Sequence, residues 1–254
     1  MEGTHKARQP VLYGERMSGI SRRQALAGLG SISVGALIAA CSDDDDSSAL
    51  DPETNTDTTA EVEPKTSSGD LASRFDDAAA CRKTAEETEG PFYFDVDKIR
   101  SDISEDREGV TLRLGVRVRD AAECKPIANA VVDVWHCDAE GSYSEPGESY
   151  CRGAQVTNRK GIVEFTTVYP GWYPGRTVHI HGKVHLDKQT VLTTQFYFDD
   201  KVSASVFVDD PYLGESNRDG FNDSDGLYQR DLELTLSKKS GGYLGLITLD
   251  VASA

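Results

Sequence analysis

Apolar and polar residues alternate along residues 110–119. The apolar members of this pattern are Val110, Leu112, Leu114, Val116 and Val118. Because successive side chains of a strand point to opposite faces, the alternation predicts a half-buried β-strand. Comparable patterns predict further strands at residues 130–136, 161–168, 177–186, 191–198, 232–236 and 243–251.

The segments between these strands are rich in Gly, Pro, Asn and Asp, which are typical turn residues. Long helical periodicities are few, and no internal repeat is evident. We therefore predict an all-β fold over residues 71–254: an antiparallel β-sandwich with long loops, of the immunoglobulin- or transthyretin-like kind.

The N-terminal 40 residues have the composition of a targeting signal. Arg22 and Arg23 directly precede a run of small apolar residues at 25–40, which is short for a membrane span. This arrangement resembles a twin-arginine export signal. Residues 38–41, Ile-Ala-Ala-Cys, resemble a lipoprotein cleavage box, which predicts a lipid anchor at Cys41. A buried N-terminal helix with an incidental cysteine is the alternative.

The charge of the chain excludes one large class of partners. The formal net charge is −16, and residues 1–40 carry five Lys or Arg against two Asp or Glu, so the chain without them is at about −19. Nucleic-acid binding requires clustered cations, so we expect none. Residues 41–70 are acidic and rich in Ser and Thr, which predicts a disordered linker between signal and domain.

Four cysteines remain after Cys41, an even number that suits disulfide formation in an exported protein. Of the three ways to pair them, we favour Cys81 with Cys124 and Cys137 with Cys151. The second pair would close a short loop, and the first would tie the N-terminal arm to the sandwich. Four free buried thiols are the alternative.

The stretch from Tyr169 to His181 carries the candidate chemistry. His179 and His181 share one face of an extended strand, roughly 7 Å apart, so their imidazoles could share a metal ion. A His-x-His pair alone is a weak signal, and His185 on the same face would also permit a three-histidine zinc site. Tyr173 favours ferric iron instead, because phenolate is a hard anionic ligand.

Several motifs, in order along residues 81–200, together resemble the intradiol ring-cleavage dioxygenases, the family that includes catechol 1,2-dioxygenase and protocatechuate 3,4-dioxygenase. They are Thr88-Glu-Gly-Pro-Phe-Tyr93, Pro126-Ile127, Ala130-Val-Val-Asp-Val-Trp-His-Cys-Asp-Ala139, Gly141-Ser-Tyr-Ser144, Pro170-Gly-Trp-Tyr173, Arg176-Thr-Val-His-Ile-His181 and Thr194-Gln-Phe-Tyr-Phe198.

The resemblance implies a site with one Fe³⁺ per domain, held by Tyr143, Tyr173, His179 and His181. It also implies that Arg176 and Gln195 stabilise negative charge on the reacting substrate, and that Tyr173 acts as ligand first and base second. The implied reaction is cleavage of a catechol by O₂ to a muconate-type diacid.

Other residues and functions stay open at this stage. Tyr150 or Tyr169 could replace one tyrosine ligand, and His136 is expected to be a buried, hydrogen-bonded histidine. A short loop at 145–153 suggests access for bulky catechols, and homo-oligomerisation is undecided. The alternative functions are a zinc hydrolase using His179, His181 and His185, and a non-catalytic transthyretin-like binding module.

Overall fold

The computed structural model describes residues 69–75 and 80–252. The predicted export signal, the anchor at Cys41 and all but the last two residues of the predicted linker lie outside this range. Within it, no helix combines the length and the apolar character needed to cross a membrane.

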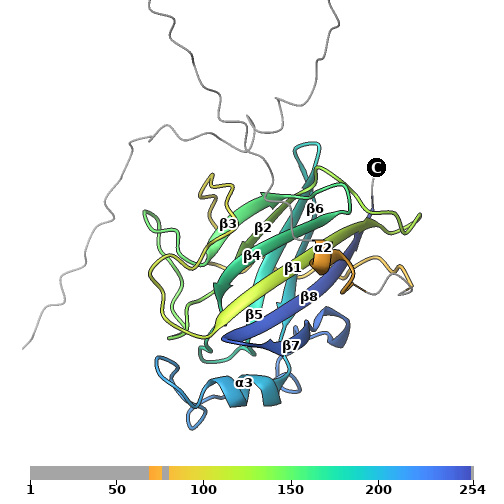
Figure 1. Ribbon diagram of the computed structural model, residues 1–254. Helices are drawn as coiled ribbons and strands as arrows, with labels where there is room; N and C mark the ends of the chain where they lie inside the picture. Colours follow the sequence, from red (N-terminus) through yellow and green to blue (C-terminus); the bar gives the residue numbers. More distant parts are fainter. Residues whose placement is uncertain (1–68, 76–79, 253–254) are drawn as a thin grey trace, which may run out of the picture.

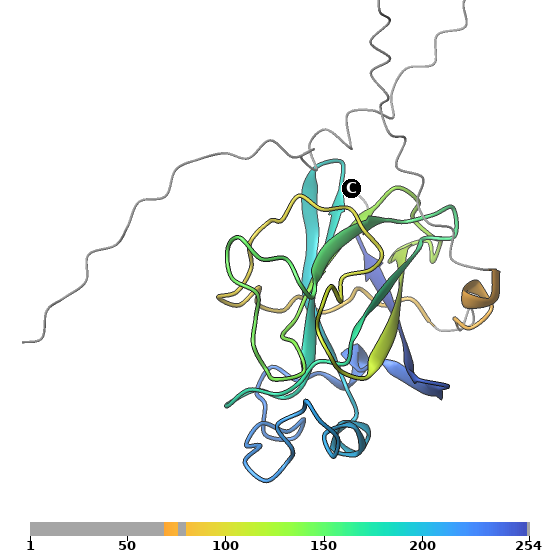
Figure 2. The same cartoon turned by 60° about the vertical axis from the view of Figure 1, so that its left-hand side comes forward.

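Two four-stranded sheets pack face to face (Figures 1 and 2). The first has the strand order β4-β1-β8-β7, with β4 at Ile162–Val168, β1 at Thr111–Asp120, β8 at Gly242–Val251 and β7 at Thr235–Lys239. The second has the order β3-β2-β5-β6, with β3 at Arg152–Val156, β2 at Val131–Trp135, β5 at His179–Leu186 and β6 at Gln189–Tyr197. The predicted sandwich is thus confirmed.

One prediction about the sheets is wrong. β1 and β8 pair in parallel along their full length, so the sandwich is not purely antiparallel. The two strands lie at opposite ends of the domain's chain, and a parallel pair of this kind leaves no hairpin signal in the local sequence. The second sheet is antiparallel throughout.

Two strands differ clearly from the predictions. β3 was not predicted, because it buries Arg152 and Gln155 and so lacks an apolar alternation. The strand predicted at 232–236 begins only at Thr235, after a short 3-10 turn. The remaining helices are α2 at Gly69–Ala72 and α3 at Asp200–Val206, and the latter begins after the N-cap Asp199.

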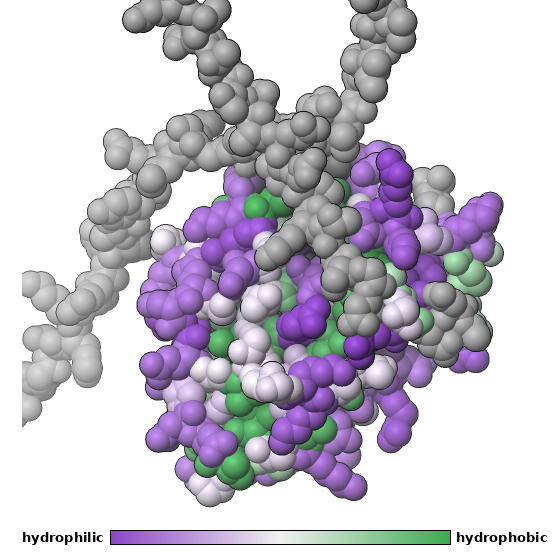
Figure 3. Space-filling view, viewed as in Figure 1, coloured by the Kyte–Doolittle hydropathy of each residue, from purple (hydrophilic) through white to green (hydrophobic). Residues whose placement is uncertain are grey.

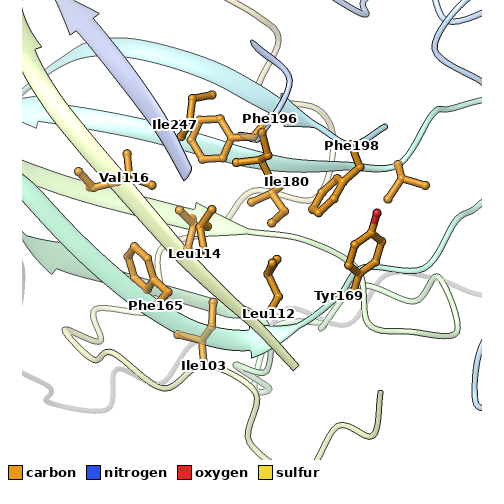
Figure 4. Close-up of a cluster of buried hydrophobic side chains, with 14 of the residues drawn as sticks. Ile103, Leu112, Leu114, Val116, Phe165, Tyr169, Ile180, Phe196, Phe198 and Ile247 are labelled. Atoms are coloured by element: carbon orange, nitrogen blue, oxygen red, sulfur yellow. The ribbon is translucent and has the colours of Figure 1, made fainter. Parts of the chain in front are cut away.

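The core lies between the inner faces of the sheets (Figure 4). The apolar face predicted for residues 110–119 supplies one side of it, and Leu112, Leu114, Val116 and Val118 are fully buried. The second sheet supplies the other side through Val132, Val134, Ile180, Val184 and Phe196. The face of the molecule seen in Figure 3 has hydrophilic residues mainly toward its edges, with neutral and hydrophobic residues between them.

The cysteines give one confirmed and one wrong prediction. Cys81 and Cys124 form a disulfide that ties the segment before β1 to the turn after it. Cys137 and Cys151 are buried free thiols. The two thiols contact different groups. The Cys137 thiol donates a hydrogen bond to the Gly171 carbonyl at 3.5 Å, and Cys151 packs against Tyr150 and Val168.

Candidate metal centre

The two histidines of the His-x-His pair lie on the outer face of the second sheet. Between them Ile180 points into the core, so His179 and His181 point away from it together. Both are buried nevertheless, because other parts of the chain cover this face. Their Nε2 atoms lie 3.1 Å apart.

The protonation of His179 is set by its backbone. Its Nδ1 donates to the Thr177 carbonyl at 2.6 Å, which leaves Nε2 with the free lone pair. The Tyr173 hydroxyl lies 3.1 Å from that Nε2. Burial lowers the pKa of His179 to about 3 and also puts the pKa of His181 well below its ordinary value. Both imidazoles are therefore neutral near pH 7, the form that binds metals.

Tyr143 reaches the same place from the loop after β2. The Asp138 carboxylate accepts hydrogen bonds from the N–H groups of Glu140 and Ser142. These bonds stabilise a turn after which the loop runs back toward the sheet. The Tyr143 ring centroid then lies 5.7 Å from that of Tyr173 and 6.1 Å from that of His181. Four of the predicted site residues thus converge from three separate segments.

The chemistry of these side chains fits a ferric ion. The Tyr143 hydroxyl is buried and has no hydrogen-bond partner among the described residues. Burial raises the pKa values of Tyr143 and Tyr173, so the phenolate forms need a strong cation beside them. Two neutral imidazoles and two hard oxygen donors suit Fe³⁺ better than Zn²⁺. That these four residues bind a metal remains a prediction.

Arg176 and Gln195 lie beside this cluster. Since β5 begins only at His179, Arg176 belongs to the preceding turn and does not follow the strand alternation. Its Nη2 donates to Gln195 Oε1 at 2.6 Å, and the Gln195 side-chain amide donates to the Thr88 carbonyl at 3.0 Å. The Arg176 guanidinium is thus directed toward the site.

Three contributors were not predicted from the sequence. Asp225 accepts from Arg176 Nε at 2.8 Å and from the Thr177 N–H at 3.0 Å, although it lies far along the chain. Trp135 stacks on His181 with 4.9 Å between ring centroids and 6° between planes. Phe92, 41% exposed, stacks on Tyr143 at 4.3 Å. Trp135 and Phe92 lie within the quoted motifs, whereas no sequence pattern marks Asp225.

The alternative tyrosines have other partners. The Tyr169 hydroxyl is hydrogen-bonded to Ser203 Oγ at 2.9 Å within the core. Tyr150 packs beneath the Arg107 guanidinium, 4.5 Å from its ring centroid.

The other histidines also have other roles. His185, four residues beyond His181, is half-buried and hydrogen-bonded to Thr190. In the part of the chain that the structure describes, no group of three or more His, Cys, Asp or Glu side chains is placed to hold a metal ion. His136 is buried with both ring nitrogens hydrogen-bonded, as expected.

Comparison with known proteins assigns the family. A family model described as "Dioxygenase" matches residues 88–214, half of the chain, which places the protein among the dioxygenases. An intradiol ring-cleavage dioxygenase from Tetranychus urticae is 32% identical with a TM-score of 0.65, and the match covers 68% of this chain and 95% of that one. The chain belongs to the intradiol ring-cleavage dioxygenase family.

Two further relatives are informative. The dioxygenase domain of a carbohydrate-binding fusion protein from Streptomyces sp. SirexAA-E is 29% identical with a TM-score of 0.55, over 68% of this chain and 100% of that one. A chlorocatechol 1,2-dioxygenase from Pseudomonas sp. (strain P51) is 28% identical over 150 residues, 48% of this chain and 58% of the relative. The chain spans about half the length of the curated relatives it matches.

Proposed function

We propose that this protein is a non-haem ferric dioxygenase that cleaves a catechol-type diol between its two hydroxyl groups with O₂. The product is a muconate-type dicarboxylic acid. The observation that carries the proposal is the convergence of Tyr143, Tyr173, His179 and His181 in a family whose named relatives act on catechols. Bound Fe³⁺ would hold the two substrate oxygens and make the ring reactive toward O₂.

Both tyrosines are half-buried as residues, but their hydroxyl groups differ, which suggests different roles. The Tyr143 hydroxyl is buried without a hydrogen-bond partner among the described residues, and burial puts its pKa well above the ordinary value. The Tyr173 hydroxyl is hydrogen-bonded to His179 Nε2, and Tyr173 directly precedes a turn. Tyr173 is therefore the better candidate to move and accept a proton from a substrate hydroxyl at its own phenolate oxygen. Tyr143 would stay in place.

Arg176 and Gln195 would stabilise the negative charge that develops as the ring opens. The guanidinium stays charged in proteins and offers several N–H donors, and Asp225 and Gln195 hold it in one orientation. Phe92, stacked on Tyr143 at the edge of the site, would help exclude water from the reacting groups.

We also propose that the protein is exported through its twin-arginine signal and anchored by lipid at Cys41. The Cys81–Cys124 disulfide supports export, because such bonds persist in oxidising compartments. Mass spectrometry of the membrane fraction checks this: an intact chain beginning at Met1 would overturn it.

The test of the reaction is metal analysis, visible absorption and oxygen uptake on protein purified from iron-replete cells. We expect about one iron per chain, a wine-red colour from tyrosinate-to-iron charge transfer, and a diacid product from catechol, hydroxyquinol or protocatechuate. The Tyr173→Phe variant should change the colour. A folded, colourless protein with zinc would favour the hydrolase, and one without metal the binding module.

A further inference from the structure

A buried arginine lies next to the candidate metal centre. Arg152, on β3, is 1% exposed and pairs in register with Trp135, whose indole stacks on His181. The ring of Phe94 lies 4.0 Å from its guanidinium, and the buried carboxylate of Asp133 is one of the charges that act on it. A cation buried in this way is stable only where hydrogen bonds and nearby charges compensate for the lost water.

The hydrogen bonds of Arg152 lead directly to Tyr143. Its Nε donates to Ser144 Oγ and its Nη2 donates to the Ser144 carbonyl at 3.0 Å. Ser144 is the residue after Tyr143, so the guanidinium holds the loop at the point where that phenol enters the site. The third nitrogen, Nη1, is buried without a hydrogen-bond partner among the described residues.

Arg152 and Tyr143 each carry a buried polar atom without a hydrogen-bond partner among the described residues: Nη1 of the guanidinium and the phenolic oxygen. The two side chains are linked through Ser144, because the guanidinium donates to both the hydroxyl and the carbonyl of the residue that directly follows Tyr143. A change at Arg152 would therefore be transmitted to the position of the Tyr143 phenol.

We propose that Arg152 is a positioning residue for Tyr143: it fixes the loop through Ser144 and places a permanent positive charge beside the phenolate that binds iron. This inference rests on the proposed function. The charge lowers the energy of the phenolate electrons, and thereby limits how readily Tyr143 donates to the metal. Arg176 has a different role, because it acts toward the substrate.

The test compares Arg152→Met with Arg152→Lys and a matched control, Arg100→Met. Arg100 donates to the Arg152 carbonyl and so braces the same strand residue without facing Tyr143. The readouts are iron affinity, the charge-transfer absorption maximum and the thermal midpoint. For Arg152→Met we expect about 10- to 100-fold weaker iron binding and a shift of the band to longer wavelength. Arg152→Lys should keep the band near its original position, and Arg100→Met should change neither affinity nor band.

The outcomes separate this inference from the proposed function. A wild-type protein without a charge-transfer band would defeat the proposed function. A coloured wild type together with a folded Arg152→Met variant of unchanged band and affinity would overturn the role of Arg152 alone. If Arg152→Met does not fold, Arg152→Lys decides: weaker iron binding with an unmoved band supports the proposal, and unchanged affinity contradicts it.

Discussion

The backbone of Gly141 passes so close to Trp172 that a Cβ on Gly141 would lie 2.2 Å from the Trp172 carbonyl oxygen. Gly141 also has a φ of +80°, a conformation that favours glycine. This approach joins the loop after β2 to the turn before β5. Because Tyr143 and Tyr173 follow these two positions closely, the contact brings the two phenols into one site.

A methyl group at Gly141 should therefore move Tyr143 and Tyr173 apart and weaken metal binding. Gly141→Ala must push the two segments apart, and we expect at least tenfold less bound iron and a loss of about 2–3 kcal/mol in the free energy of unfolding. Gly147→Ala is the control, since its φ of +108° is also positive but its Cβ would meet nothing within 4 Å. Urea unfolding and metal analysis check both, and equal iron loss in the two variants would contradict the argument.

The histidines of β5 provide a second test. His179→Asn removes the Nε2 atom that faces His181 and Tyr173, so iron content should fall by at least roughly tenfold. His185→Asn changes the same residue type on the same strand outside the cluster, and should retain both iron and colour. Loss of iron in both variants would support a three-histidine site instead.

Local patterns in the sequence could predict much of this architecture. The alternation at residues 110–119 predicts β1 because one side of that strand is buried in the core and leaves a period of two. β3 leaves no such period, since it buries the polar residues Arg152 and Gln155. The β1–β8 pairing and the Asp225–Arg176 ion pair join residues far apart in the chain, and neither contact leaves a local signal.

The Cys81–Cys124 disulfide should be a major source of stability. It joins residues 43 apart in the sequence. Closing a loop of that length lowers the conformational entropy of the unfolded chain, which stabilises the folded state by about 4 kcal/mol. Cys81→Ser with Cys124→Ser should lower the thermal midpoint without altering bound iron. Cys137 and Cys151 should react with a thiol reagent only after unfolding, because both are buried. Rapid labelling of either thiol in the native protein would be inconsistent with this structure.

His136 should make the iron-free protein sensitive to mild acid. Burial lowers its pKa from 6.5 to about 4, so the unfolded chain binds one more proton than the folded chain between these values. His136 does not reduce the free energy of unfolding above about pH 6.5. As the pH falls from there to about 4, the free energy of unfolding decreases by about 3 kcal/mol because of this residue. His136→Gln should flatten that slope relative to His185→Gln, as measured by urea unfolding across the range. Parallel slopes would rule out His136 as the cause.

Asp225 should affect turnover more than metal binding. Its pKa lies below the ordinary value: burial raises it, but hydrogen bonds from the N–H groups of Leu227 and Thr177 and from Arg176 outweigh burial. The carboxylate is therefore charged at neutral pH and holds Arg176 in place. In Asp225→Asn we expect kcat to fall about 10- to 100-fold with bound iron unchanged, because the orientation of the guanidinium is lost.

The exposed neighbour Asp223 gives the matched control for that variant. Asp223→Asn removes the same charge from the same loop without touching Arg176, so kcat should stay near the wild-type value. Steady-state kinetics by oxygen uptake distinguish the two, with iron measured on each preparation. If Asp225→Asn raises KM while kcat is unchanged, Arg176 contributes to substrate binding alone. If it loses iron, Asp225 supports the metal centre through Thr177 and His179, and its assignment to Arg176 is wrong.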